Sequence, residues 1–121
     1  PSVRVDQFLI MQALANIFDN AIDVLREKSD GSRQIVIYTQ KSKDLVEVGV
    51  RDNGKGLADT DRQKVFQPFV TTKRHGTGLG LYICKSIIER HNGEISVESS
   101  LGQGAAVIFK LPTSQIAISQ N

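Results

Sequence analysis

Two glycine clusters in the middle of the chain have the residue types needed to hold a flat ring and an anionic group. The first, DNGKGL, covers residues 52–57, and the second, GTGLGL, covers residues 76–81. Glycines without a Cβ let a ring lie directly against the backbone of the first cluster. Asp52 can accept a hydrogen bond from an exocyclic amine such as that of adenine, which the keto edge of guanine does not offer. The alternative is that Asp-Asn-Gly forms only a tight turn.

The second cluster has the composition of an anion-binding loop. Apolar residues recur at helical spacing from 79 to 88, so GTGLGL is expected to open a helix. Free N–H groups and the positive end of the helix dipole then point at whatever occupies the loop. The loop is not a Walker A motif, because Gly-Lys-Ser/Thr is missing, and it lacks the GxGxxG spacing and preceding strand of a dinucleotide-binding turn. The basic segment 73–75 can contact terminal phosphates, although a solvated loop explains Arg74 and His75 equally simply.

An earlier helix carries polar residues suited to a metal ion. At 100° per residue, Asn16, Asn20 and Asp23 fall within roughly 60° of one another. An asparagine carbonyl is a hard oxygen ligand for Mg²⁺, which keeps several waters and takes further ligands from phosphates. Asn20 is therefore a candidate ligand, although such a face is more commonly only solvated. The opposite face is expected to pack, and its members are Phe8, Met11, Leu14, Phe18, Ala21, Ile22 and Leu25.

The elements that must position these residues follow from hydrophobic period and breakers. Asp6 is a plausible N-cap for the first helix, and Gly93 is expected to end the last helix in a positive-φ conformation. The order is helix, two strands, short helix, helix and two strands, which predicts an α+β fold, a two-layer sandwich with an antiparallel-rich sheet. The segments are 7–28, 34–39, 45–50, 59–66, 79–91, 94–99 and 105–111.

Composition limits the function classes. A chain of 121 residues, 40% hydrophobic and 23% charged, fits one globular domain. We place that domain at 1–112, with its N-terminal edge open to truncation, and a tail at 113–121. Fifteen basic and thirteen acidic residues give a formal net charge of +2. The sequence has no Lys/Arg block of the kind found in nucleic-acid-binding proteins. Cys84, the only cysteine, predicts a reducing compartment and a small core residue. No uninterrupted apolar run approaches the roughly 20 residues of a membrane span.

Four segments in order carry a family resemblance: NIFDNAID, DNGKG, VFQPFVTTK and GTGLGL. They resemble the N, G1, F and G2 boxes of the catalytic, ATP-binding domain of bacterial sensor histidine kinases, over roughly residues 1–111. The resemblance implies the Bergerat fold, a mixed, mostly antiparallel sheet backed by three helices. ATP would lie between the asparagine-bearing helix and a short lid at 71–77.

The resemblance also implies residue roles. Asn20 would coordinate Mg²⁺, Asn16 and Asp23 would line the phosphate side, and Asp52 would bind the adenine amine. Asn16 and Asn20 are thus the predicted catalytic pair. The remaining predicted nucleotide contacts are Gly54 and Gly56 beside the base, and Thr72, Lys73, Gly76, Thr77, Gly78, Leu79, Gly80 and Leu81 in the lid and phosphate loop.

Two positions distinguish subgroups within this resemblance. Family members often carry Lys or Arg at the position of Asp23, and an aspartate there is similar to the nitrogen-regulation and dicarboxylate-sensor subgroup. In the ATP-hydrolysing relatives a glutamate one turn before the metal asparagine acts as general base. Asn16 stands at that position and cannot take a proton at neutral pH, which favours transfer to a protein side chain over hydrolysis.

The implied function is transfer of the ATP γ-phosphate to a histidine on a separate dimerisation domain of the parent protein, with a response regulator downstream. The chain lacks that domain's His-Glu or His-Asp pair, so we expect a cytoplasmic, monomeric fragment that binds nucleotide but autophosphorylates poorly. The parent can be anchored in the inner membrane. Two alternatives stay open: a serine kinase of the anti-sigma type, and a nucleotide-binding module without catalysis.

Overall fold

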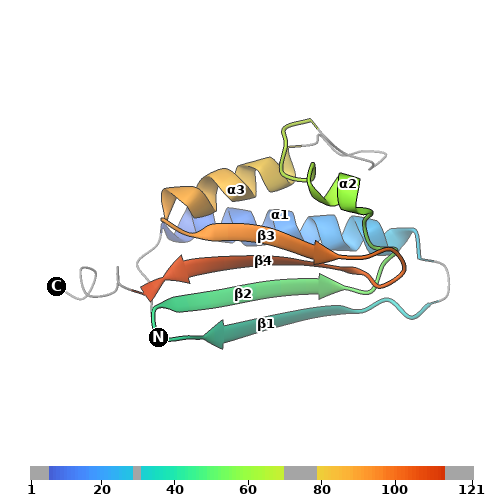
Figure 1. Ribbon diagram of the computed structural model, residues 1–121, viewed down its shortest axis with the longest axis horizontal. Coiled ribbons are helices and arrows are strands. Elements are labelled where there is room, and N and C mark those ends of the chain that lie inside the picture. Colours follow the sequence, from blue (N-terminus) through green and yellow to red (C-terminus); the bar gives the residue numbers. More distant parts are fainter. Residues whose placement is uncertain (1–5, 29–30, 70–78, 114–121) are drawn as a thin grey trace.

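The computed structural model describes residues 6–28, 31–69 and 79–113. Within them the chain forms a sheet of four strands with helices packed against it (Figure 1). The elements in order are α1 (Gln7–Arg26), β1 (Ile35–Lys41), β2 (Leu45–Asp52), α2 (Asp59–Arg62), α3 (Gly80–Arg90), β3 (Glu94–Ser99) and β4 (Ala105–Pro112).

The sheet has the strand order β1-β2-β4-β3, and each of its three ladders is antiparallel. The predicted hairpin is confirmed as β1 and β2, and the last two predicted strands as β3 and β4. Both long helices cover the same face of the sheet and run alongside each other (Figure 1). The predicted α+β two-layer sandwich is therefore confirmed. The boundary between a domain at 1–112 and a tail stays a prediction, because residues 114–121 lie outside the described part.

The first helix begins where the sequence indicates. The Asp6 carboxylate accepts a hydrogen bond from the Leu9 N–H at 3.2 Å, which is the expected N-cap. Its backbone N–H donates to Nε2 of His91 at 2.9 Å, which ties the start of α1 to the end of α3. At the other end, the Arg33 guanidinium donates to the carbonyls of Arg26 and Lys28 and so caps the helix C-terminus.

The buried face of α1 differs from the expected stripe. Phe8 and Met11 were expected in the core, but they are 89% and 61% exposed. Ile17, which was not in the predicted stripe, is buried against α3 and the sheet. The helix is apolar on most sides, so its period does not select one face. The packing against α3 selects the buried face, where Cys84 of α3 reaches the Ala13 carbonyl. The buried residues of α1 are Ala13, Ile17, Ala21 and Leu25.

The same apolar character gives α1 the length and composition of a membrane span. Core helices of soluble proteins can have the same length and apolar composition, so these two properties are weak evidence for a membrane span. Here the helix packs its buried face on α3 and the sheet within the core cluster.

Cys84 lies in the core, as predicted. It is fully buried on α3, and its thiol donates to the Ala13 carbonyl at 3.1 Å. Burial raises the pKa of this thiol to about 12. The thiol therefore stays protonated at neutral pH and acts as a packing residue.

The end of α3 corrects one prediction. The positive φ lies at Asn92, with φ 59°, and not at Gly93. Asparagine adopts this conformation more readily than other residues with a side chain. Gly93 is needed for a different reason, since a Cβ there would lie 2.2 Å from the Lys110 carbonyl oxygen. The glycine thus allows the chain to pass directly beside β4.

On the face of the sheet away from the helices, a tyrosine ring lies across a glycine of the neighbouring strand. Tyr38 on β1 lies across Gly49, where a Cβ would meet its ring at 2.1 Å. Its hydroxyl donates to Glu47 at 3.0 Å. Burial is the main reason why the pKa of Tyr38 is raised, and the hydrogen bond to the Glu47 carboxylate is the second. Glu47 also faces Lys110, at 3.9 Å, so the ring is flanked by an ion pair.

Candidate functional site

Asp52 is the buried polar centre of the site. It is the last residue of β2 and only 6% exposed. Its carboxylate accepts the Gly54 N–H at 2.8 Å and the backbone N–H of Ala105. Burial raises the pKa of Asp52 above its usual value of 3.8, and the two amide donors partly oppose that rise. Two fixed donors leave the carboxylate with lone pairs for one further donor.

Two backbone segments approach closely around this carboxylate. A Cβ at Gly56 would lie 2.1 Å from the Ser100 carbonyl oxygen, and one at Gly104 would lie 2.1 Å from the Asp52 carbonyl oxygen. Both glycines also have positive φ, 75° and 78°. The first glycine cluster therefore packs against the turn at 100–104, and a side chain at either position would separate them. Within the protein itself, Gly56 is therefore needed for the close approach of these two segments.

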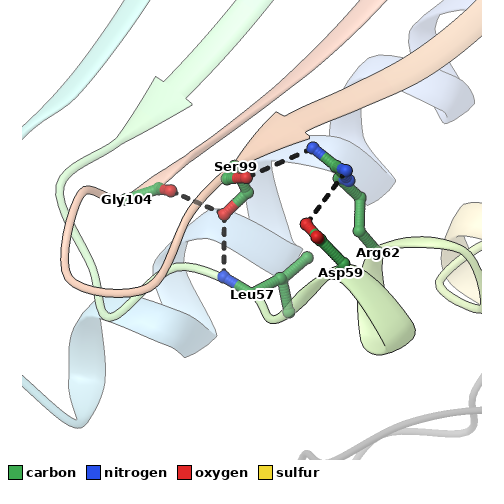
Figure 2. A network of polar contacts seen from close by, with 5 residues as sticks. All are labelled: Leu57, Asp59, Arg62, Ser99 and Gly104. Carbon is green, nitrogen blue, oxygen red and sulfur yellow. Dashed lines mark hydrogen bonds and ion pairs between the residues drawn. The ribbon is translucent and has the colours of Figure 1, made fainter.

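A polar network ties the same two segments together (Figure 2). The Ser99 hydroxyl donates to the Gly104 carbonyl at 2.7 Å and accepts from the Leu57 N–H at 2.7 Å. Sequence reasoning missed both Ser99 and Gly104. The available signal was the second glycine pair, Gly102 and Gly104, because its spacing resembles that of DNGKG.

The first glycine cluster also rests on α1. A Cβ at Gly54 would lie 2.4 Å from Cγ1 of Val24, so this glycine lies directly on the helix. Lys55 forms an ion pair with Glu27 at 3.3 Å. Asp52 and its glycines are thus held beside the turn of α1 that follows Asn20.

The described end of the second cluster meets α1 at Asn16. The Asn16 amide donates to the Gly80 carbonyl at 3.4 Å. Gly80 is the first residue of α3, one residue after the predicted start at 79, and Leu79 at the N-cap supplies no side-chain hydrogen bond. Among the described residues, the N-cap position therefore contributes no side-chain cap to the first N–H groups of α3, and helix starts attract anions.

The structure thus places the predicted residues around one region of α1. Asn16 and Asn20 are both half-buried, one helical turn apart. Asp23 forms an ion pair with Arg26 at 3.2 Å. The predicted contacts Thr72, Lys73, Gly76, Thr77 and Gly78 lie outside the described residues.

The ionisation of Asp52 predicts a pH dependence. Because burial raises its pKa, ionised Asp52 costs folding stability. Relative to the ionised form, protonated Asp52 stabilises the fold, and this stabilisation is fully present below the unfolded pKa and is lost as the pH rises through the folded pKa. Binding of an amine donor has the opposite dependence, since it needs the carboxylate. We expect the affinity for Mg-ATP to fall as the pH is lowered toward the Asp52 pKa.

Calorimetry between pH 7 and the onset of acid unfolding, on the wild-type chain and Asp52→Asn, measures this effect. The ratio of the two affinities removes the titration of ATP itself, which both proteins share. At pH 7 we expect the wild-type chain to bind Mg-ATP about 10 to 100 times more tightly than Asp52→Asn, which corresponds to the free energy of one charged hydrogen bond. In acid we expect this ratio to be smaller. A ratio that does not change with pH would contradict the prediction.

Asp52, the start of α3 and the two asparagines of α1 lie around one stretch of a two-layer α+β sandwich, an arrangement that suits a nucleotide-binding domain. The chain belongs to the family described as histidine kinase-, DNA gyrase B- and HSP90-like ATPases, whose model matches residues 5–115.

Curated relatives and solved structures agree with this family. The alginate biosynthesis sensor protein KinB of Pseudomonas aeruginosa is 39% identical over 93% of this chain, and the C4-dicarboxylate transport sensor protein DctS of Rhodobacter capsulatus is 33% identical over 95%. The chain spans only 18% of the length of each. The catalytic domain of histidine kinase ThkA superposes with a TM-score of 0.77 at 38% identity, covering 92% of this chain and 70% of that one. The chain is therefore a domain of the histidine kinase catalytic type.

Proposed function

We propose that this domain positions Mg-ATP so that the γ-phosphate passes to a histidine on a separate domain of its parent protein. The observation that supports this most directly is the contact of Asn16 with Gly80. It brings the start of α3 against the amide-bearing turn of α1, next to the segment that holds Asp52. Base, phosphate and metal contacts then fall on one continuous surface.

The base end follows from Asp52. Its carboxylate is oriented by two backbone donors and is nearly excluded from water. The 6-amino group of adenine is a hydrogen-bond donor and can bond to the remaining lone pairs of the Asp52 carboxylate. Guanine has a keto oxygen at that position, and two oxygen acceptors would then face each other without a proton to share. The site therefore favours ATP over GTP.

The metal end fits Mg²⁺ with few protein ligands. Among residues 6–28, 31–69 and 79–113, no group of three or more His, Cys, Asp or Glu side chains is placed to hold a metal ion. Magnesium needs no such group, because it keeps several waters and binds phosphate oxygens. The Asn20 carbonyl oxygen would supply one protein ligand. When bound, the ion would neutralise charge on the transferring phosphoryl group.

The phosphate side favours transfer over hydrolysis. The Asn16 side chain is an amide engaged with the Gly80 carbonyl, so it cannot remove a proton from water. The first N–H groups of α3 would hold the phosphates, and the acceptor would bring its own nucleophilic nitrogen. The domain then contributes position and charge neutralisation, which supply most of the catalysis in phosphoryl transfer.

The test is phosphorylation of an added acceptor. Purified chain is incubated with Mg²⁺, ATP labelled at the γ-phosphate and the histidine-bearing domain of its parent, and the product is treated with acid. We expect labelled acceptor that loses its label in acid, because phosphohistidine is acid-labile. Acid-stable label would indicate a serine kinase, and nucleotide binding without any labelled acceptor would indicate a binding module.

The setting of the parent protein is part of this proposal. The full-length ShkA structure in complex with AMPPNP, with a TM-score of 0.78 at 30% identity, covers 93% of this chain, which spans 23% of that one. A longer parent of this kind would carry the phosphoacceptor domain and pass phosphate to a response regulator. The domain itself would work in the cytoplasm, with or without a membrane anchor elsewhere in the parent.

A further inference from the structure

Ser99 is a side chain with no role in the function proposed above, and it joins the two segments that hold Asp52. It is the last residue of β3. Its hydroxyl donates to Gly104 and accepts from Leu57, both at 2.7 Å, as Figure 2 shows. The hydroxyl thus donates a hydrogen bond to the turn at 100–104 and accepts one from the loop at 53–57.

The loop supplies one of the two donors to the Asp52 carboxylate, the Gly54 N–H at 2.8 Å. The second donor is the N–H of Ala105, which is the first residue of β4, directly after the turn, and the partner of Asp52 in the β2–β4 ladder. The separation of the loop from the turn therefore sets where the Gly54 donor lies relative to the donor that the sheet holds fixed. A backbone bond from the Gly102 N–H to the Lys55 carbonyl, at 2.7 Å, links the segments at their tips, whereas Ser99 links them at the end nearest the sheet.

The position of Ser99 is itself fixed by α2. The Arg62 guanidinium donates to the Ser99 carbonyl at 3.4 Å and pairs with Asp59 at 3.0 Å (Figure 2). Both the backbone and the hydroxyl of Ser99 are therefore bonded, and the hydroxyl has little freedom to turn elsewhere.

We propose that Ser99 is a positioning residue for base recognition. Its hydroxyl holds the loop at 53–57 and the turn at 100–104 at the separation at which Asp52 presents its free lone pairs to the 6-amino group of adenine. This inference rests on the proposed function, because it assumes that Asp52 binds that amine. Without the hydroxyl, the Leu57 N–H and the Gly104 carbonyl lose a shared partner, and the carboxylate loses its fixed plane.

The test compares two nucleotides that differ only in the amine. Mg²⁺ complexes of ATP and of purine riboside triphosphate, which has hydrogen in place of the amine, are titrated calorimetrically into the wild-type chain, Ser99→Ala and Ser99→Thr. For the wild-type chain we expect ATP to bind about 10 to 100 times more tightly. In Ser99→Ala we expect ATP affinity to fall about tenfold with little change for the analogue, so that the ratio shrinks. Ser99→Thr keeps the hydroxyl and should keep the ratio.

Ser96→Ala is the matched control. Ser96 lies on the same strand but is exposed on the opposite face, because it is three residues away. Its replacement should leave both affinities unchanged. Equal weakening of both nucleotides in Ser99→Ala would show a purely structural role and overturn the inference, as would unchanged binding of both. A wild-type ratio near one would instead contradict base recognition by Asp52, and so the proposed function.

A second measurement does not depend on the stability of any variant. Amide hydrogen exchange in the wild-type chain should show the Leu57 N–H protected, because it is bonded to Ser99. Exchange at the rate of an open loop would overturn the inference even if Ser99→Ala failed to fold.

Discussion

Replacing Asn20 by alanine is expected to lower the rate of phosphate transfer from Mg-ATP by about 100-fold or more. The side chain is the amide that would join the metal to α1, one turn after Asn16. Removing even an outer-shell partner of a metal site typically costs 10- to 100-fold, and a direct ligand costs at least as much. Labelling of the acceptor domain at a series of Mg²⁺ concentrations measures this loss.

The magnesium dependence separates a metal role from a folding defect. In Asn20→Ala, binding of ATP without magnesium should match the wild-type chain, because the base contacts are untouched. Gln40→Ala is the control, since it also removes an amide and lies exposed on β1, at the far edge of the sheet. Full activity of Asn20→Ala at ordinary magnesium would remove Asn20 from the metal site.

Replacing Gly104 by alanine is expected to destabilise the fold by about 2–5 kcal/mol. The left-handed backbone at φ 78° costs roughly 1–2 kcal/mol for a residue with a Cβ, and the clash with the Asp52 carbonyl adds about 1–3 kcal/mol. In a domain of this size, each kcal/mol lowers the melting temperature by about 3–6 °C. Thermal unfolding followed by circular dichroism measures the change.

Gly102→Ala isolates the close approach. Gly102 has a similar φ of 82°, but nothing lies within 4 Å of a Cβ placed there. It should therefore show only the backbone cost, about 1–2 kcal/mol. Equal melting temperatures for the two variants would mean that the turn relaxes away from Asp52 and that the segments are not tightly packed.

The order of elements was predictable from sequence, but the orientation of α1 was not. Hydrophobic period, the Asp6 cap and the glycine breakers identified the two long helices and the four strands. The buried face of α1 depends on α3, which contacts Ala13 and Ile17 from a segment some 70 residues later. A helix that is apolar on most sides carries no local signal for that choice.

The site shows the same division. Asp52, its glycines and the asparagine face of α1 were identified because their residue types and order were informative. Ser99 was missed because its importance arises from contact between β3, β4 and the first glycine cluster, which no local pattern contains, whereas the spacing of Gly102 and Gly104 was a local signal for Gly104. A serine at a strand end is also among the least distinctive residues in any sequence.

The tyrosine on the helix-free side of the sheet has a consequence for solubility. An open face of aliphatic side chains invites another sheet to stack on it. Here a phenol ring on a glycine, with its hydroxyl bonded to Glu47 and a lysine beside that carboxylate, makes the surface wettable. Gly49 is what makes room for the ring. The missing Cβ on β2 thus lets a ring with a polar tip, beside the ion pairs of Glu47 with Lys110 and Arg51 with Glu98, form part of the water-facing side of the sheet.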